Sequence, residues 1–350
     1  MNAYRGDNVV NRALDSESII KPKDGKFFTL FFRYRELGLV LFIVILCIVI
    51  QSRNGSFLTF ENLNDMLKNT AIMAILAVGM MMVLITRGID LSIGAIIALS
   101  GMLCAQLVSS YSMNPLLIIL LGMAIGIICG LVNGFLISKI GILPIIATLA
   151  LLNILRGLTY EISNGEWISS YQMSEEFLNI ATGSVFGINN LISIAIVIYI
   201  IFYYILNHTI IGRQVYAVGS NPESATISGI NQNRVLLFVY GTMGGLAGLS
   251  GVLWVSKFAS AQGDTASGYE MTVIAACILG GVSIAGGSGK ISGVVLGALL
   301  LGILQNALPL LNVSPFWQTG IQGAIILFAV ILNTLVKRKV DRNNLLRRKI

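Results

Sequence analysis

Long apolar runs separated by short polar stretches dominate the chain, and this alternation predicts a membrane protein of many helices. A membrane-spanning helix needs roughly 20 mostly apolar residues. The runs that approach this length are Leu37–Gln51, Asn69–Thr86, Leu91–Ser109, Pro115–Ile137, Leu143–Ile162, Leu191–Leu206, Val235–Val255, Met271–Ile284, Ile291–Pro309 and Phe316–Val336. The pattern therefore predicts an all-α polytopic membrane protein with about ten transmembrane helices.

Two stretches interrupt this pattern. The run Met271–Ile284 is short and rich in glycine, which predicts a broken or half-depth helix surrounded by protein rather than lipid. The stretch Thr86–Gly94 places charge and a chain break between two apolar runs, either as a cytoplasmic turn or as a break within the membrane. Ala77–Gly101 and Ile278–Gly302 share the order helix, glycine-rich break, helix. This is either a true internal repeat, as in many transporters, or a chance likeness of two glycine-rich segments.

The polar segment Gly212–Ile230 lies between two strongly apolar runs and predicts a very short helix with both ends specified. Asn221 is suited to cap its start, because a side-chain oxygen there can accept from the free N–H groups of the first turn. Pro222 then occupies the first helical position and Glu223 the first turn, where the helix dipole favours negative charge. Gly229 ends the helix about two turns later. A helix this short is marginal alone, so we expect a partner to hold it.

Composition supports a single integral membrane domain and excludes a soluble enzyme. Of the 350 residues, 55% are hydrophobic and only 11% are charged, with a mean hydropathy of +0.83. Soluble domains average about 25% charged residues, so most of this surface cannot face water. The first 35 residues contain several acids, and no small-residue cleavage site follows an early apolar run. They are therefore not expected to form a signal peptide.

The net charge of +7 is concentrated at the two ends of the chain. Seven of the 23 Lys and Arg residues precede Glu36, and seven more follow Val336. By the positive-inside rule both termini are expected in the cytoplasm, which agrees with an even number of spans. The cytoplasmic loops would then be those at Lys139, Gly212–Arg234 and Lys290, and the outward-facing segments carry Glu61, Asp65, Glu161, Glu166, Glu175, Glu176, Asp264 and Glu270. Topology and anionic lipid head groups, rather than nucleic acid, account for the basic tail.

Glycines recur at helical spacing within the apolar runs and predict closely packed helices. Small residues let helices approach and pack by van der Waals contact in lipid. One such face comprises Gly122, Gly126, Gly130 and Gly134, and another comprises Gly241, Gly244, Gly245, Gly248 and Gly251.

Polar residues in or beside the apolar runs are candidates for a translocation path or gate: Asp90, Ser92, Arg156, Glu161 and Glu270. Ionisable residues inside a membrane are costly and usually functional. The structural alternative for Asp90 is the N-cap of the helix that follows it. Arg156 and Glu161, near the outer end of one run, would alternatively pair with each other or extend to the interface. The same alternatives apply to Lys257 and Glu270, which bracket an external segment.

The sequence offers no residues for catalysis, metal binding or nucleotide binding. The four cysteines lie inside apolar runs, and no Cys/His pair has metal-ligand spacing. The sole histidine, His208, lies where an apolar run meets the polar segment, which favours an interfacial or capping role. Ala285–Lys290 imitates a phosphate-binding loop, but Ile284 stands where that pattern needs glycine and Ile291 where it needs Ser or Thr. The chain of acids and histidines that relays protons in pumps is missing as well.

Three segments together resemble one family of membrane proteins. Gly88–Gly94 (Gly-Ile-Asp-Leu-Ser-Ile-Gly), Gly212–Ile230 and Leu279–Gly289 match, in the right order, motifs of the ribose/xylose/arabinose/galactoside class of ABC importer permeases. The resemblance runs from about Phe57 to Asn333. It is specific to the family and not to one sugar.

The resemblance implies a permease of the bacterial inner membrane that moves a monosaccharide, a ribose-like pentose or related simple sugar, into the cytoplasm by alternating access. Its implied partners are a second permease subunit, an ATPase with two nucleotide-binding cassettes, a periplasmic sugar-binding protein and membrane lipids. ATP and Mg²⁺ would be bound by the ATPase and no cofactor by this chain. The residues that would contact the ATPase are Gly212, Arg213, Ala217, Gly219, Asn221, Pro222, Glu223, Ala225, Ser228 and Gly229. Ser224 and Thr226 are mild departures from the family pattern.

On this interpretation the chain has three parts: a basic cytoplasmic extension (1–35), an integral permease domain (36–336) that contains the ATPase-coupling loop (208–234), and a basic cytoplasmic tail (337–350). The role of the extension is open, as is the choice between a homodimer and a pair of paralogues. Two alternative functions are a secondary transporter or channel that uses ion gradients and a purely structural membrane subunit. The coupling loop and the absence of a proton relay favour the ABC importer.

Overall fold

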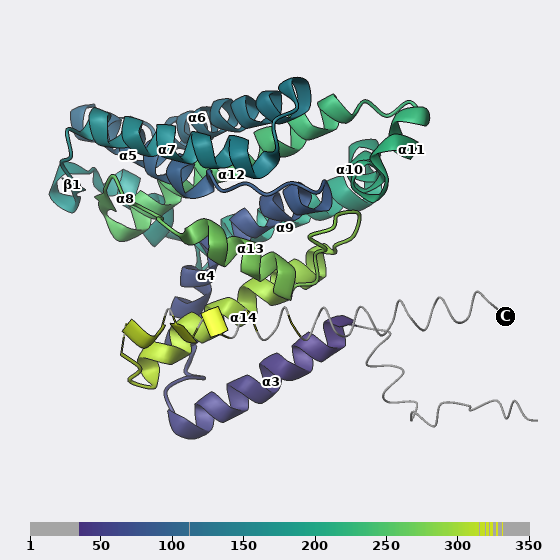
Figure 1. Cartoon of the computed structure of the whole chain (residues 1–350). Coiled ribbons are helices and arrows are strands. Elements are labelled where there is room, and N and C mark those ends of the chain that lie inside the picture. Colours follow the sequence, from purple (N-terminus) through teal and green to yellow (C-terminus); the bar gives the residue numbers. More distant parts are fainter. Residues whose placement is uncertain are drawn as a thin grey trace, which may run out of the picture.

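The structure is a computed structural model, and it describes residues 35–111 and 113–314, together with residues 316–318, 320, 321, 323, 324, 327 and 331. The described chain is built almost wholly from helices (Figure 1). In this view α5, α6, α7 and α12 form an upper group, α14 and α3 lie at the bottom, and α4 runs between the two groups. The predicted all-α polytopic fold is confirmed.

The first three helices are α3 (Arg35–Arg53), α4 (Phe60–Ile85) and α5 (Ile93–Ser110). Thr59 caps α4, because its side-chain oxygen accepts from the N–H of Asn62 at 3.4 Å. The cap explains why α4 begins nine residues before the predicted run at Asn69, in a first turn of polar residues. Between α4 and α5 the chain leaves helical geometry over 86–92, and we call this segment the first break.

The next part of the chain is α6 (Pro115–Phe135), the π-helix η1 (Leu136–Ile140) and α7 (Pro144–Ser163). Asn114 caps α6 by accepting from the N–H of Leu116 at 2.9 Å. Gly141 ends η1 with a φ of 83°, a left-handed conformation that glycine adopts without strain. Pro144 then opens α7 at its first position, where the missing N–H costs nothing.

Short elements follow α7. They are β1 (Ile168–Ser169), the 3₁₀-helix η2 (Ser170–Gln172), α8 (Glu175–Thr182), β2 (Ser184–Val185) and β3 (Ile188–Asn189). Among them α8 packs against α12. β2 and β3 form an antiparallel hairpin with Val185 opposite Ile188. β1 instead pairs with β4 (Ser260–Ala261), which follows α12, so that Ile168 lies opposite Ala261.

The remaining helices are α9 (Asn190–His208), α10 (Ile210–Ser220), α11 (Pro222–Ile227), α12 (Gln232–Phe258), α13 (Tyr269–Leu279) and α14 (Ile291–Leu310). At 11 residues α13 is too short to span a bilayer, as predicted for Met271–Ile284. Residues 280–290 between α13 and α14 form a glycine-rich loop, which we call the second break.

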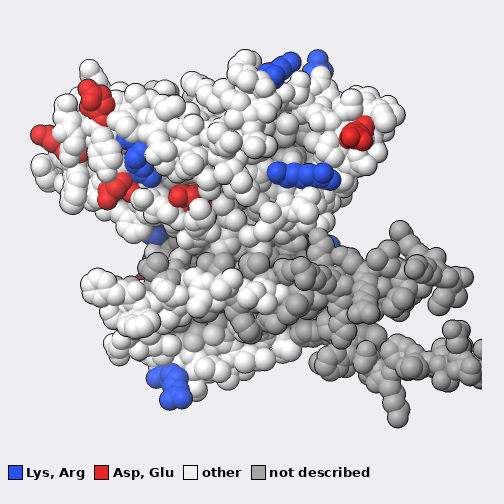
Figure 2. Space-filling model, in the orientation of Figure 1, with Lys and Arg blue, Asp and Glu red and all other residues white. Residues whose placement is uncertain are grey.

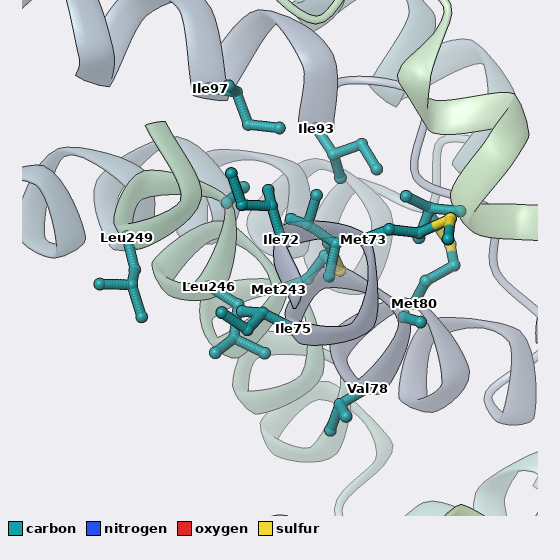
Figure 3. Close-up of a cluster of buried hydrophobic side chains, with 14 of the residues drawn as sticks. Ile72, Met73, Ile75, Val78, Met80, Ile93, Ile97, Met243, Leu246 and Leu249 are labelled. Carbon is teal, nitrogen blue, oxygen red and sulfur yellow. The ribbon is translucent and has the colours of Figure 1, made fainter. Parts of the chain in front are cut away.

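The core surrounds α4, whose residues are buried on nearly every side from Thr70 to Ile85. Figure 3 shows side chains of α4, including Ile72 and Met73, between side chains from α5 and α12, such as Ile93 and Met243. A helix this apolar and this buried is held by protein on all sides rather than by lipid. In contrast, α3 exposes most of its apolar side chains, as a helix at a lipid boundary does.

The predicted glycine faces meet each other. α6 and α12 pack so closely that a Cβ built on Gly126 would lie 2.7 Å from the amide nitrogen of Gly248. A Cβ on Gly244 would likewise lie 2.8 Å from the backbone of Gly130. Backbone atoms cannot move aside as a flexible side chain can, so this contact requires glycine.

The described residues contain eight helices long and apolar enough to cross a membrane, and α13 is a ninth apolar helix of lesser length. All of the predicted runs up to Pro309 correspond to one of these helices, although several boundaries differ. The predicted run Phe316–Val336 falls largely outside the described residues, and the extension 1–35 and tail 337–350 do so almost entirely. The exact number of spans and the side of each terminus therefore stay predictions.

Candidate functional site

The candidate site is the end of the molecule where α10 and α11 lie, at the right of Figure 1. The helix α10 folds back sharply over the end of α9. Thr209 starts it, since its side-chain oxygen accepts from the N–H of Gly212 at 3.2 Å. Gly212 lies against the backbone of α9, where an added Cβ would come within 2.6 Å of the Cα of Leu206. No side chain fits there, so the tight reversal depends on this glycine.

The short helix α11 has the caps that the sequence predicted. Asn221 Oδ1 accepts from the N–H of Ser224 at 3.0 Å, Pro222 occupies the first position, and Glu223 lies in the first turn. Gly229 follows with a φ of 81°, and a Cβ added to it would have no other atom within 4 Å. The left-handed backbone conformation alone therefore favours glycine here. The helix occupies Pro222–Ile227, within the predicted segment.

Most of α11 projects from the molecule. Ala225 is its one buried residue, and the side chain of Ile227 is 87% exposed. Gln232 at the start of α12 holds it from behind, because Nε2 donates to the carbonyl of Pro222 and to the hydroxyl of Thr226, both at 2.6 Å. The helix therefore presents most of its surface, including the apolar side chain of Ile227, outside the helix packing.

The end of α10 is fastened to both breaks at one place. The Arg87 guanidinium donates from Nε to the carbonyl of Gly219 and from Nη2 to that of Ser220, both at 2.7 Å. The N–H of Gly287 donates to the carbonyl of Ile85 at 2.9 Å. We call these five residues the junction. Its hydrogen bonds connect the end of α4, the end of α10 and the loop before α14.

The packing of the junction is as close as its hydrogen bonding. A Cβ built on Gly219 would lie 2.8 Å from the amide nitrogen of Gly287. Arg87 adopts a φ of 65°, a left-handed conformation that is uncommon outside glycine and is held here by its two hydrogen bonds. Its positive charge also lies at the C-terminal end of α10, where the helix dipole favours cations.

A second bond ties α10 to the second break. The hydroxyl of Tyr216 donates to the carbonyl of Gly289 at 2.8 Å, one residue before Lys290 and the start of α14. Burial raises the pKa of the Tyr216 phenol, so the group stays protonated and remains a donor. Movement of α10 would therefore be transmitted to α14 as well as to α4.

The structure brings the predicted coupling residues together on one surface of α10 and α11. Gly212, Gly219 and Ala225 are buried and make the packing, whereas Arg213, Asn221 and Glu223 are exposed. Ala217 and Pro222 are half-buried, and Ser228 and Gly229 are exposed beyond the last turn. The sequence did not predict that Gly212–Ser220 forms part of a second helix, α10. Whether these residues contact an ATPase remains a prediction.

Asp90 and Ser92 lie in the first break and are both fully buried. Asp90 Oδ1 accepts from the N–H of Ser92 at 2.9 Å and from its hydroxyl. The predicted N-cap is therefore wrong, because Asp90 bonds a residue that precedes α5 rather than its first turn. Ser92 in turn accepts from the amide of Asn133 on α6 at 2.9 Å. The first break is thus built into the helix packing and is not a free turn.

Arg156 and Glu161 do not pair with each other. Arg156 Nη1 donates to the carbonyls of Gly263 and Thr265, both at 2.8 Å, and so holds the loop between α12 and α13. Glu161 is exposed near the end of α7. Across the described residues the ion pairs join Lys68 to Asp65 and Lys290 to Glu36. The alternative of an Arg156–Glu161 pair is wrong, because the guanidinium reaches inward instead.

Glu270 is buried at the start of α13 and faces α5. A Cβ built on Gly94 would lie 2.8 Å from Glu270 Oε2, and this oxygen has no hydrogen-bond partner among the described residues. The five predicted path residues therefore occupy different places, with Asp90 and Ser92 in one network and Arg156 and Glu270 around the loop before α13. Whether they line a translocation path remains a prediction.

Sequence reasoning missed the role of Arg87, which entered only as part of the charge within Thr86–Gly94. Its position two residues after the end of α4 and one before Gly88 was the available clue. It also missed Tyr216, because a tyrosine in an amphipathic stretch carries no signal of a partner 73 residues away. His208 ends α9 and packs between two tyrosines, with its ring stacked 5.5 Å from that of Tyr204, which fits the predicted interfacial role.

Charge divides the two ends of the molecule. In Figure 2 acidic groups gather at the left, over β1 and α8, with some basic groups among and below them, and basic groups lie at the right, toward α10 and α11, where one acidic patch also lies. We call these the acidic end and the basic end. Exposed acidic residues at the acidic end are Glu161, Glu166, Glu175, Glu176 and Asp264, and exposed basic residues at the basic end are Arg87, Lys139, Arg213, Arg234 and Lys290.

Comparison with known proteins gives a consistent result over most of the chain. Residues 62–330 match the family described as branched-chain amino acid transport system / permease component. The chain is 36% identical over 310 residues to the ribose import permease protein RbsC of Escherichia coli K12, covering 88% of this chain and 96% of that protein. The identity is 40% over 299 residues to RbsC of Bacillus subtilis 168, covering 85% and 92%.

A further relative is the L-arabinose ABC transporter permease protein AraH of Azospirillum brasilense, 36% identical over 301 residues, which cover 85% of this chain and 86% of that protein. No solved structure matches the chain significantly.

Proposed function

The chain belongs to the family of branched-chain amino acid transport system permease components and is a multi-pass permease subunit, and we propose that it imports a monosaccharide. The relatives described above are named for ribose and for L-arabinose, which are both pentoses. A ribose-like pentose or a related simple sugar is therefore the proposed substrate, and the bacterial inner membrane the proposed location.

The observation that carries the coupling assignment is the junction. The helix α11, which projects at the basic end, is joined to α10 by the single residue Asn221, and the end of α10 is hydrogen-bonded to Arg87 and packed on Gly287. A partner that grips α11 can therefore push on α4 and α14 at the same time. A permease powered by a separate ATPase requires such a mechanical input at its cytoplasmic side.

The basic end is the proposed cytoplasmic side. The positive-inside rule places loops rich in Lys and Arg there, and the exposed basic residues of this end lie on several separate loops. The acidic end would then face the periplasm, where a sugar-binding protein docks. The extension 1–35, the permease domain 36–336 with its coupling loop 208–234, and the tail 337–350 keep their predicted assignment in this scheme.

The proposed assembly has a second permease subunit and an ATPase with two nucleotide-binding cassettes, which bind ATP and Mg²⁺. The cassettes close on ATP, and α11 carries their movement into the membrane helices. The permease contributes no catalytic residue to hydrolysis in this scheme. Energy for transport must come from contacts that differ between the two permease conformations, because only differential affinity shifts such an equilibrium.

Uptake by proteoliposomes tests the proposal. The permease is reconstituted with its partner ATPase and binding protein, and uptake of labelled ribose and arabinose is measured with and without ATP. Uptake that needs both ATP and the ATPase is expected. Uptake by the permease alone, driven by an imposed proton or sodium gradient, would establish the secondary-transporter alternative instead.

Substitution in the coupling loop tests the role of α11. Gly229→Val forces a β-branched residue into left-handed geometry, which costs roughly 1–2 kcal/mol or more, and it should lower uptake per ATP hydrolysed. Asn221→Val removes the cap oxygen and costs about 1 kcal/mol of helix stability, with the same expected result. Gly141→Val is the matched control, because Gly141 also has a left-handed φ of 83° and open space around it, on another basic-end loop. Equal effects at Gly141 and Gly229 would refute the assignment.

A further inference from the structure

A cavity of about 220 Å³ opens in the half of the molecule nearer the acidic end, between α4, α12, α13 and α14. Its walls combine three aromatic rings, three side-chain amides and one ammonium group, from Trp254, Phe258, Tyr269, Asn69, Gln305, Asn306 and Lys257. Aromatic faces and side-chain amides therefore line the same cavity. None of these residues belongs to the coupling loop or to the junction.

The aromatic wall is fixed by contacts among its rings. The Trp254 and Tyr269 rings meet edge to face, with centroids 5.0 Å apart and planes at 84°. Trp254 also lies 5.0 Å from the ring of Phe258, one turn along α12. Contacts of this geometry hold aromatic rings in place. The indole is half-buried, so that part of its surface is left for a ligand.

The polar wall offers both donors and acceptors. Lys257 Nζ donates to the amide oxygen of Asn69 at 2.7 Å, and the amides of Asn306 and Asn62 bond each other in both directions at 3.0 and 3.1 Å. The side chain of Gln305 hydrogen-bonds to no other described residue, although Gln305 is half-buried and lines the cavity. A side-chain amide carries two donors and an acceptor, so Gln305 is equipped to bind a hydroxyl group.

Close approach of two helices forms the floor. Gly302 of α14 lines the cavity and touches Thr70 of α4, so that a Cβ there would collide with the threonine side chain. A larger residue in place of Gly302 therefore could not be accommodated without moving α4 or α14. Gln305 and Asn306 lie about one turn beyond this contact, on the same helix.

The chemistry of the lining selects its ligand class. Drug-sized ligands occupy pockets of about 300–1,000 Å³, so a cavity of about 220 Å³ suits a smaller molecule. Aromatic faces pack on C–H groups, and amides bond hydroxyls in either direction. The lining has no carboxylate, which makes it unsuited to a cation or an amino group. A single sugar ring, with C–H groups on its faces and hydroxyls around its edge, meets all of these conditions.

A larger cavity, of about 420 Å³ between α4, α9 and α14, does not share this chemistry. It is lined almost wholly by aliphatic side chains, and the Tyr199 hydroxyl on its wall already donates to the carbonyl of Ala74 at 3.0 Å. Sugar hydroxyls would find no partner there and would lose their bonds to water. Size alone therefore does not identify the sugar site.

We propose that the smaller cavity is a binding station for a monosaccharide within the permease, with Trp254 stacking on the sugar ring and Gln305 bonding its hydroxyls. The inference rests on the proposed function, and it adds the place at which sugar is held after the binding protein releases it. Position supports this role. The cavity lies toward the proposed periplasmic end, and α4 and α14, which form two of its walls, continue to the junction.

Direct binding tests the station without requiring transport. The permease, in lipid nanodiscs, is titrated with ribose, arabinose and leucine while tryptophan fluorescence is recorded. Of the three tryptophans, only Trp254 lines the cavity, so Trp254→Phe should abolish a saturable change that ribose or arabinose produces. Leucine should produce no such change. A sugar response that survives Trp254→Phe, or none in the wild type, overturns the inference.

Transport kinetics give the second test. Gln305→Ala removes one neutral hydrogen bond to the sugar. Sugar affinity should therefore fall, and KM for uptake should rise, roughly two- to tenfold. Trp254→Ala should lower the affinity and raise KM by more. Asn153→Ala is the control, because Asn153 is an exposed amide of α7 that bonds only its own helix, to Leu149. It should leave both quantities unchanged.

The failures are distinguishable. If the wild type lacks ATP-dependent uptake, the proposed function fails, and the fluorescence titration still decides whether the cavity binds sugar. If the wild type imports sugar while Gln305→Ala and Trp254→Ala match the control in KM, the station is refuted and the permease assignment stands.

Discussion

Replacing Arg87 offers the sharpest test of how force enters the permease. The Arg87→Ala variant loses the two hydrogen bonds to the end of α10, at Gly219 and Ser220, and with them a cation at a helix C-terminus. Hydrogen bonds to charged groups contribute about 1.5–3 kcal/mol each when buried. The Arg87 side chain is partly exposed, so solvent lowers this contribution, and a total of about 2–3 kcal/mol for the pair is the more realistic value.

This magnitude sets the expected effect on coupling. Every 1.4 kcal/mol is a factor of ten, so the equilibrium between an attached and a detached α10 should shift by roughly 30- to 140-fold. Uptake per ATP hydrolysed should fall by up to that factor, whereas ATP hydrolysis by the cassettes should continue. Arg87→Lys keeps the charge but lacks the planar fork that reaches both carbonyls, so an intermediate loss is expected.

The assay is sugar uptake and phosphate release measured together on proteoliposomes that contain the permease, its ATPase and its binding protein. Lys139→Ala serves as the control, because Lys139 is an exposed cation of the basic end on a different loop. If Arg87→Ala and Lys139→Ala give the same uptake per ATP, the junction does not transmit force. Loss of ATP hydrolysis together with uptake would instead indicate that the ATPase no longer docks, and would equally refute a purely mechanical role.

Three further substitutions test the packing and the polar contacts. Gly126→Val drives a side chain into the backbone of Gly244 and should destabilise the fold by about 3 kcal/mol or more, beyond ordinary overpacking, seen as a lower thermal midpoint in detergent. Asp90→Ala leaves the Ser92 N–H and hydroxyl buried without their acceptor and should cost about 1–3 kcal/mol for each, whereas Asp90→Asn, which keeps the acceptor, should be milder; equal midpoints for the two would contradict this. Tyr216→Phe removes the half-buried hydrogen bond to the Gly289 carbonyl and should lower stability by about 0.5–1.5 kcal/mol. Coupling should fall slightly, and an unchanged ratio of uptake to ATP hydrolysed would contradict this.

Local chemistry made α11 predictable. Asn221, Pro222 and Gly229 act through their own backbone neighbours, so their roles could be derived without knowledge of the fold. The glycine faces of α6 and α12 were predictable for a related reason, because the spacing of small residues already defines a surface. The limits of α4 were not, since its first turn is as polar as a loop and is stabilised by the cap at Thr59.

Long-range contacts explain what the sequence could not predict. Asp90 precedes a helix and has the right chemistry for a cap, but packing of Asn133 on Ser92 turns the chain so that the carboxylate bonds Ser92 instead. The cavity is assembled from side chains as far apart in sequence as Asn69 and Gln305. No local pattern relates such positions, and each of them looked like an isolated polar residue on an apolar helix.

Rigid helices join the junction to the cavity. α4 ends at Ile85, itself a residue of the junction, and contains Asn69 in its first half. α14 starts two residues after Gly289 and carries Gln305 near its other end. A helix of 20 residues is about 30 Å long and does not compress appreciably. A displacement of α10 is therefore carried toward the cavity walls, provided that neither break absorbs it. Gly219 and Gly287 lie in backbone contact at the point where the breaks meet α10. This close packing leaves no space in which either break could absorb the displacement. In the proposed mechanism, close packing at this place allows a short helix at one end of the molecule to change the shape of a site near the other.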